Sequence, residues 1–374
     1  MILNDKQQYV YDKLLKIFGN VVLEKEEILK QYIVNDAQLD FIEVTNEYLN
    51  DKYNDVLYPR TENLFKKYIL PPFSVLDTKS AKWLNRRELL DEYFGDSLIG
   101  RSAGLTYSNW IEREKTKSNK KDFIVKMVRK DDNGSSKFDS VLCEILLKWF
   151  GFPKCKVYDC FAGGHIRGAM AVKLGYDYLG IDLATEQIEA NFIQAEKLGL
   201  KVDWINDDSL NVDRYLEDNS IDLFFSCPPY GDLEKYTDNP RDLSNMSYQG
   251  FINIYEQIIQ KGCNKLKQDR FAVFVVGDFR DKQSFYRGFI KDTIIAFEKA
   301  GMKLYNEIIL LNALSTASIR ASNTFNNRKM VKVHQNILVF YKGDSKNIQR
   351  IYGKVDSSLP IITKNQSNLF NINL

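Results

Sequence analysis

The chain has few of the residues that hold metals or form disulfides. It contains two histidines, His165 and His334, and five cysteines among its 374 residues. Two histidines are too few for a multi-histidine metal site. An odd number of cysteines without Cys-x-x-Cys spacing predicts neither a zinc site nor a disulfide framework. We therefore expect a protein without a metal that works in a reducing compartment such as the cytoplasm.

The sequence also lacks an apolar run long enough to span a bilayer, and residues 1–6 lack the pattern of a signal peptide. Hydrophobic residues make up 44% of the chain and charged residues 27%, which is typical of a soluble globular protein. These features predict a cytoplasmic protein with no membrane partner. The length suffices for two domains or for one elaborated domain.

Excess charge of one sign is missing too, because the formal net charge is only +2. The local distribution is more informative than the total. Residues 312–333 include Arg320, Arg328, Lys329 and Lys332 and no acid. Such a segment can neutralise phosphates even in a nearly neutral chain. A second basic stretch, residues 111–130, is better explained as a solvated helix face.

From Phe138 onward, helix and strand patterns alternate along the chain. Helices are predicted over residues 140–150, 166–174, 185–198, 248–267 and 284–300, and seven strands over residues 157–159, 178–182, 202–206, 221–226, 271–277, 304–311 and 336–341. This alternation predicts an α/β fold with a doubly wound, mostly parallel sheet covered by helices. Because no helix is evident between the last two strands, we expect them to pair antiparallel.

The patterns divide the chain into three regions. Residues 1–137 are predicted to form a mainly helical N-terminal region, with loops at 117–121 and 131–136. Residues 138–343 form the α/β domain, and residues 344–374 form a polar C-terminal tail.

Residues 157–168, Val-Tyr-Asp-Cys-Phe-Ala-Gly-Gly-His-Ile-Arg-Gly, predict a strand, a glycine turn and the start of a helix. Small residues let the backbone approach a ligand closely, and a helix N-terminus offers free amide groups. The next strand ends in Asp182, whose carboxylate can accept hydrogen bonds from two ribose hydroxyls. The strand after it leads to a turn with Asp208. An ordinary strand-to-helix turn or a dinucleotide-binding loop would look similar, and each acid, Asp208 above all, can be a helix cap.

A rigid aromatic loop follows the strand 221–226. Its residues are Ser226, Cys227, Pro228, Pro229 and Tyr230. Two prolines must end the strand, because they cannot donate backbone hydrogen bonds. The carboxyl end of a strand is where ligands bind in open α/β sheets, and a stiff loop with a flat ring suits holding a flat base there. A plain turn after a core strand is the alternative.

In their order and spacing, these motifs resemble the S-adenosylmethionine-dependent DNA methyltransferases that act on exocyclic amino groups, and among them phage and prophage DNA methylases. The resemblance covers residues 138–343 and extends upstream to residues 71–77. It implies the methyltransferase sheet, S-adenosylmethionine as cofactor, and the cytoplasm of a bacterial or phage-infected cell. The N-terminal region would be accessory or contact DNA, and the first 65 residues have no assigned role.

The resemblance also implies a set of cofactor-binding residues. They are Phe138, Asp139, Asp159, Phe161, Gly163, Gly164, Asp182 and Asp208. Asp182 would bind the ribose, and Asp208 would accept from the adenine amino group. The chain departs from the family at one position, because Gly164 comes one residue early and His165 stands where the second glycine is usual.

The catalytic residues that the resemblance implies are Ser226, Cys227, Pro228, Pro229 and Tyr230. The family places Asp, Asn or Ser directly before the two prolines, and this chain has Cys227. A thiol is a weak acceptor, so we expect Cys227 to shape the loop while Ser226 or Asp232 contributes polarity. An inert buried thiol is the second interpretation, and a nucleophile for cytosine C5 methylation is the third.

The implied reaction is methyl transfer to adenine N6 or cytosine N4 of double-stranded DNA, on a base flipped out of the stack. Tyr230 would stack on that base, and Arg320, Arg328, Lys329 and Lys332 would bind DNA. Three alternatives stay open: an RNA methyltransferase, a C5 methyltransferase that uses Cys227, and a non-catalytic, cofactor-binding DNA-recognition protein.

Overall fold

The computed structural model describes residues 64, 68–95, 138–231, 237, 239–312 and 317–353. The chain divides into two compact units, Met1–Pro72 and Phe73–Leu374, and all helices and strands given below belong to the second. The helices expected in the first 63 residues, the loops expected at 117–121 and 131–136, and the tail beyond residue 353 lie outside the described residues.

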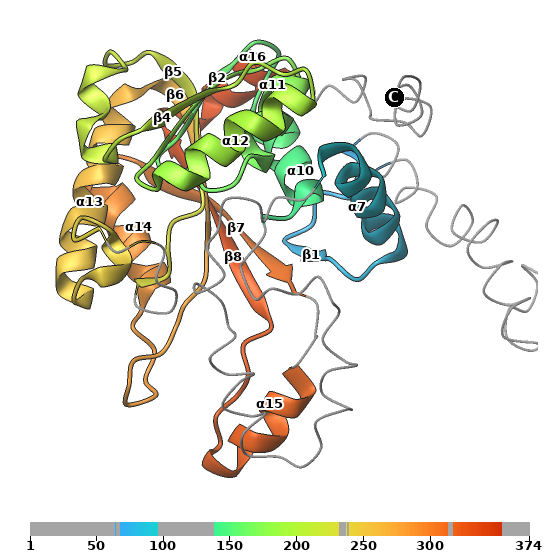
Figure 1. The fold of residues 1–374 in the computed structure, drawn as a ribbon, viewed down its shortest axis with the longest axis vertical. Helices are drawn as coiled ribbons and strands as arrows, with labels where there is room; N and C mark the ends of the chain where they lie inside the picture. Colours follow the sequence, from blue (N-terminus) through green and yellow to red (C-terminus); the bar gives the residue numbers. More distant parts are fainter. Residues whose placement is uncertain are drawn as a thin grey trace, which may run out of the picture. The chain divides into compact units, whose positions relative to one another are not determined.

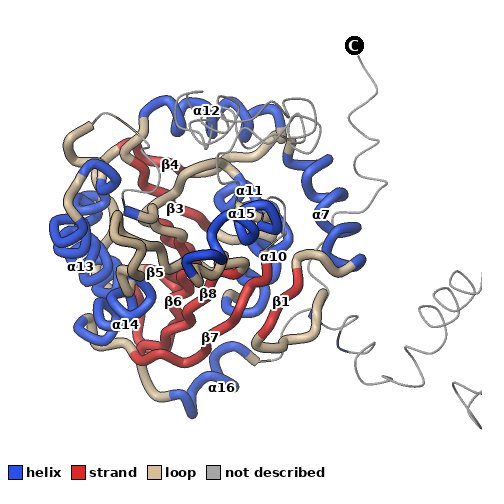
Figure 2. The backbone as a smooth tube through the Cα atoms, turned by 90° about the horizontal axis from the view of Figure 1, so that it is seen from below, coloured by secondary structure: helices blue, strands red, loops and turns tan. Residues whose placement is uncertain are grey.

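An eight-stranded sheet forms the centre of the second unit (Figure 2). Its strand order is β1-β7-β8-β6-β5-β2-β3-β4. The strands are β1 (Val75–Asp77), β2 (Lys156–Asp159), β3 (Asp177–Asp182), β4 (Asp203–Asn206), β5 (Ile221–Ser226), β6 (Leu266–Val276), β7 (Lys303–Leu311) and β8 (His334–Lys342). All neighbours pair in parallel except β8, which is antiparallel to both β6 and β7. The predicted fold class and the antiparallel pairing of the last two strands are confirmed.

Helices cover both faces of this sheet. The α-helices are α7 (Ala81–Phe94), α10 (Ser140–Phe150), α11 (Ile166–Lys173), α12 (Thr185–Lys197), α13 (Tyr248–Lys265), α14 (Phe289–Lys299), α15 (Ala317–Thr324) and α16 (Ile348–Tyr352), and the 3₁₀ helices are η2 (Ser209–Arg214), η4 (Leu243–Asn245), η5 (Phe325–Asn327) and η6 (Ser345–Asn347). Figure 2 shows α10, α11 and α12 on one face and α13 and α14 on the other. Within the described parts of the chain, no helix has the length and apolar character needed to cross a membrane.

The core explains why the sequence of β5 is a continuous apolar run. All six of its residues are buried, as expected for a central parallel strand covered on both faces. Phe224 of β5 packs edge-on against Phe274, with ring centroids 4.9 Å apart. It also lies so close to α13 that a Cβ at Gly262 would be 2.3 Å from its ring. The close approach of α13 to the sheet therefore requires glycine at this position.

The structure differs from the sequence prediction at two elements, a strand and a helix. β1 adds an eighth strand beside β7, so residues 75–94 belong to the same compact unit as residues 138–353. The helix α15 lies between β7 and β8, where none was predicted. The reason is that Ala317 is its only buried residue, so it carries no apolar stripe in the sequence. The division between residues 137 and 138 stays a prediction.

The connection between β6 and α14 also differs. Helix α14 begins at Phe289 and not at Ser284. Residues 277–288 instead form a hairpin, in which Arg280 and Tyr286 make an isolated antiparallel bridge. Ser284 and Gly288 have φ values of 74° and 82°, which a helix cannot contain. Figure 1 shows this hairpin and α15 extending from the same end of the sheet.

Candidate functional site

The glycine loop, residues 160–165, joins β2 to α11 at the carboxyl edge of the sheet. Asp159, at the end of β2, is fully buried beneath it. The Asp159 carboxylate accepts hydrogen bonds from Arg167 Nε at 2.6 Å, Tyr178 OH at 2.9 Å and Ser226 Oγ at 2.6 Å. Both carboxylate oxygens therefore already accept hydrogen bonds from other side chains of the protein. The structure shows Asp159 anchoring the loop from below.

Arg167, on the first turn of α11, is the main partner of Asp159 and was not among the predicted site residues. Its guanidinium donates to the carbonyls of Phe161 and of Ala162, the latter at 3.1 Å, and lies 4.7 Å from the centre of the Phe138 ring. Burial by itself lowers the pKa of Arg167, but the Asp159 carboxylate, together with Cys227 and Tyr178, raises the pKa overall. A buried cation that holds two loop carbonyls fixes the shape of the loop.

Asp182, at the end of β3, lies beside the glycine loop as predicted from the sequence. Its two carboxylate oxygens accept from the backbone N–H groups of Gly163 at 2.7 Å and Ala184 at 2.9 Å. The Gly163 carbonyl in turn accepts from Asn191 Nδ2 at 2.7 Å, and Gly163 has a φ of 50°. Burial raises the pKa of the Asp182 carboxyl, against the effect of the two N–H donors.

The residue in the place of the second family glycine is part of the packing between helices. His165 is buried, and its Nε2 lies 3.0 Å from the carbonyl oxygen of Phe94 at the end of α7. His165 is also the N-cap residue of α11. His165 therefore connects the glycine loop to α7, and Gly163, two residues earlier, has the positive φ.

Asp208 follows β4 at the same edge and caps a helix. Its Oδ1 accepts from the backbone N–H of Leu210 at 3.0 Å and so caps η2. The neighbouring Ser209 donates from its hydroxyl to the carbonyl of Cys160 at 2.6 Å. The sequence left helix capping open as a role for Asp208, and the structure shows that Asp208 has this role. The turn is tied to the glycine loop through Ser209.

Phe138 and Asp139 lead into α10 beside the glycine loop. Asp139 caps α10 by accepting from the Leu142 N–H at 3.0 Å, and its Oδ2 accepts from Trp83 Nε1 at 3.2 Å and from Arg87. Phe138 meets Phe225 of β5 edge to face, with ring centroids 5.8 Å apart. Through these contacts, Phe138 packs on β5 and Asp139 is hydrogen-bonded to α7.

The Pro-Pro-Tyr loop, residues 226–230, is joined to the glycine loop by Ser226. The Ser226 side chain is fully buried; its hydroxyl donates to Asp159 and accepts from the Phe161 N–H at 3.2 Å. Pro228 is buried, whereas Tyr230 is half-buried. The Tyr230 hydroxyl accepts from Gln335 Nε2 at 2.6 Å. Asp232 lies outside the described residues.

Cys227 differs in exposure from the other four cysteines; all five lie within the described residues. It is the one half-exposed thiol, while Cys143, Cys155, Cys160 and Cys263 are buried. Burial raises the pKa of all four buried thiols, that of Cys155 to about 12. Cys227 also interacts electrostatically with the buried Arg167. Of the five, it is the thiol that a ligand at this edge can reach.

The basic segment, residues 312–333, connects β7 to β8 at the edge that carries Tyr230. Lys332 Nζ lies 3.5 Å from Asn336 Oδ1, and Lys329 Nζ donates to Ser284 Oγ of the hairpin at 3.2 Å. Arg328 has a φ of 53° and stacks on Phe325, and Arg320 is half-buried. Burial lowers the pKa of Lys332. The segment ends two residues before Gln335, which donates a hydrogen bond to Tyr230.

No protein-family model and no curated protein matches this sequence. Solved structures show similarity in fold. TrmN from Thermus thermophilus is 14% identical with a TM-score of 0.38, over 59% of this chain and only 52% of TrmN. A methyltransferase from Pyrococcus furiosus is 15% identical with a TM-score of 0.38, over 64% of this chain and 100% of that protein. A DNA modification methylase, also from Thermus thermophilus, is 18% identical with a TM-score of 0.28, over 37% and 51% of the two chains. At these identities the similarity concerns the fold alone.

Proposed function

We propose that this protein transfers a methyl group from S-adenosylmethionine to an exocyclic amino group of a base flipped out of DNA. The observation that carries the proposal is the position of Ser226, whose hydroxyl bonds both to Asp159 and to the Phe161 N–H. This link fixes the Pro-Pro-Tyr loop directly against the glycine loop. A base held by the first loop and a cofactor held by the second would then be neighbours.

The residues beside the glycine loop fit the proposed cofactor. A carboxylate has about four lone-pair sites, and the two backbone bonds of Asp182 leave acceptor capacity for ribose hydroxyls. The same holds for Asp208, which uses Oδ1 for its cap. S-adenosylmethionine supplies the methyl group when it is bound. Phe138, Arg167 and Asp159 would contribute by holding the loop in shape.

The Pro-Pro-Tyr loop would hold the base. Tyr230 presents a half-buried ring whose hydroxyl is fixed by Gln335, so stacking would order few additional torsions. The Pro228 carbonyl would accept a hydrogen bond from the target amino group and direct its lone pair at the methyl carbon. Ser226 acts as a positioning residue, because its hydroxyl is turned inward.

Mass spectrometry of nucleosides tests this proposal most directly. DNA from cells that express the protein is expected to contain methylated adenine N6 or cytosine N4, and purified protein should methylate DNA in preference to an RNA of matched sequence. Methylation of the RNA alone would contradict the DNA assignment. Cofactor binding without turnover on either substrate would favour a non-catalytic recognition protein.

A C5 methyltransferase is the second candidate, because the half-exposed Cys227 lies within the electrostatic reach of Arg167. If the amine attacks the methyl group directly, Cys227→Ser should keep substantial activity, since serine is a residue that the family uses at this position. If Cys227 attacks C6 of a pyrimidine, the serine variant should be inactive, and DNA containing 5-fluorocytosine should trap the wild type covalently. Methylation assays and a denaturing gel decide between the two.

The basic segment leads to a prediction about DNA binding. Alanine at Arg320, Lys329 and Lys332, with asparagine at Arg328 to suit its positive φ, should weaken binding and reduce the salt dependence. Each lost phosphate contact should lower the slope of log affinity against log salt by about 0.9 on duplex DNA.

A matched control for this variant carries alanine at Lys156, Lys197, Lys201 and Lys303. These side chains are exposed and lie near the amino ends of the strands, so the control changes the net charge equally without touching the carboxyl edge. Fluorescence anisotropy across a salt series measures both slopes. Equal slopes for the two quadruple variants would place the DNA path elsewhere.

A further inference from the structure

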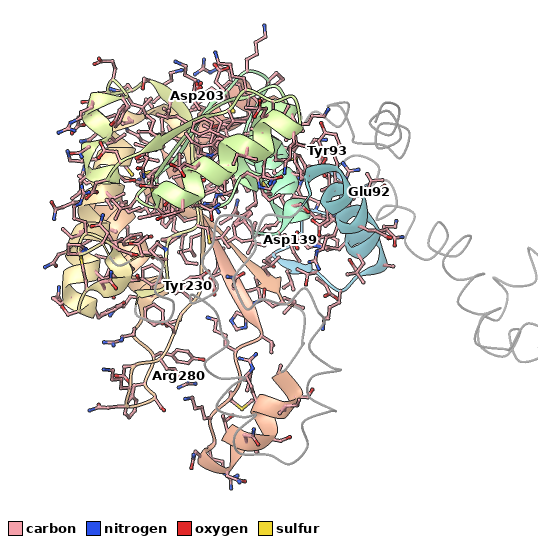
Figure 3. The ribbon with its side chains drawn as sticks, viewed as in Figure 1. Glu92, Tyr93, Asp139, Asp203, Tyr230 and Arg280 are labelled. Carbon is pink, nitrogen blue, oxygen red and sulfur yellow. The ribbon has the colours of Figure 1, made fainter. Side chains whose placement is uncertain are left out.

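The hairpin of residues 277–288 has no part in the proposed chemistry and still has a defined structure. The Arg287 N–H donates to the Phe279 carbonyl at 2.9 Å, and the Asp281 N–H donates to the Phe285 carbonyl at 2.8 Å. It extends from the end of the sheet that carries Tyr230 (Figure 3). A Cβ at Gly277, at its base, would lie 3.7 Å from the Tyr230 ring. The hairpin therefore borders the place proposed for the base.

Two carboxylates hold the hairpin in shape. Asp278 Oδ1 accepts from the backbone N–H groups of Phe279, Gly288 and Phe289 at 2.9, 3.0 and 3.2 Å. Asp281 Oδ1 accepts from Gln283 and Phe285 near the tip, each at 2.9 Å. Because both acids accept hydrogen bonds from backbone N–H groups of the hairpin, the backbone conformation that carries its side chains is fixed.

The tip of the hairpin carries exposed apolar side chains. Phe285 is 69% exposed and Tyr286 46% exposed. The basic segment presents Met330 at 66% and Phe325 at 51%, and the bond from Lys329 to Ser284 ties it to the hairpin. Several exposed apolar side chains on two connected loops indicate an interaction surface.

The charge around these side chains is mainly positive. The Arg280 guanidinium lies 3.9 Å from the centre of the Tyr286 ring, and Lys282 and Arg328 are exposed. Cations interleaved with aromatic rings fit phosphates and base faces at once. The first half of the hairpin, from Gly277 to Lys282, spans at most about 18 Å. This length is enough to cross the major groove of B-DNA, which is about 12 Å wide.

We infer that the hairpin grips duplex DNA and that Phe285 inserts its ring between bases beside the flipped nucleotide. Removing a base from the stack leaves neighbouring base faces exposed, and an apolar wedge covers them. The inference rests on the proposed function and adds a second DNA-binding element, distinct from the basic segment. It assigns Phe285 as a positioning residue that stabilises the flipped state.

Four variants test this inference with unmethylated bacterial genomic DNA as substrate. Phe285→Ala should lower kcat/KM for DNA by about 5- to 150-fold, as expected for loss of one base–aromatic stack. Its affinity for S-adenosylmethionine and its thermal unfolding should match the wild type. Phe73→Ala is the matched control, because Phe73 is 54% exposed and precedes β1 toward the amino edge. This control should retain full activity.

The second pair of variants gives an optical readout. The tryptophan of Phe285→Trp should be quenched on addition of the DNA, whereas Phe73→Trp should respond as the wild type does. If the wild type methylates DNA and both Phe285 variants behave like their Phe73 controls, the inference is wrong and the proposed function stands. If the wild type neither binds nor methylates DNA, the inference and the proposed function are both wrong. Quenching by RNA stem-loops alone would overturn the assignment to DNA.

Discussion

Replacing Asp182 with alanine is expected to weaken S-adenosylmethionine binding by about two to four orders of magnitude. Two charge-assisted hydrogen bonds to ribose hydroxyls would be lost, each contributing about 1.5–3 kcal/mol. The substitution also removes the acceptor for the Gly163 and Ala184 N–H groups, which shape the glycine loop. Isothermal titration calorimetry measures the loss, and thermal unfolding shows whether the variant is folded.

Asp182→Asn is the matched control for this prediction. It keeps the size of the side chain and one good acceptor, so its loss of affinity should be smaller. Because burial raises the pKa of Asp182, the carboxylate of the wild type protonates at a higher pH than an ordinary aspartate. Wild-type affinity should therefore fall as the pH is lowered through that raised pKa, and the asparagine variant should lack this dependence. Unchanged affinity in a folded alanine variant would contradict the cofactor site.

Replacing Tyr230 with alanine should lower kcat/KM for DNA by about 5- to 150-fold and leave cofactor affinity unchanged. The flipped base would lose its stacking platform, and base–aromatic stacking contributes about 1–3 kcal/mol. Single-turnover methylation and calorimetry separate the two effects. A variant as active as the wild type would show that the base stacks elsewhere.

Two conservative variants isolate the role of the Tyr230 hydroxyl. Tyr230→Phe and Gln335→Ala each remove the 2.6 Å bond between the two side chains and leave the ring in place. Both should lose less activity than Tyr230→Ala, because a typical intramolecular hydrogen bond contributes only about 0.5–1.5 kcal/mol net. If Tyr230→Phe is as inactive as the alanine variant, the hydroxyl itself takes part in the chemistry.

The sequence by itself determined the alternation of strands and helices and the edge at which the motifs meet. Short apolar runs bounded by proline, glycine and acids mark strands such as β5, and parallel strands place their carboxyl ends at one edge. This argument was enough to bring Asp182 beside the glycine loop and Tyr230 to the same edge. It depends on local patterns and on a general topological rule, not on side-chain contacts.

Only the tertiary structure decided which polar groups face inward. Ser226 and Asp159 are 67 positions apart, and nothing in either motif shows that the serine hydroxyl would bond to that carboxylate. The hairpin and α15 were likewise invisible in the sequence. Their shape depends on capping carboxylates, positive φ values and contacts such as Lys329 with Ser284, and not on apolar periodicity. Periodicity reports burial, so it identifies the sheet and its helices and misses exposed loops built from polar contacts.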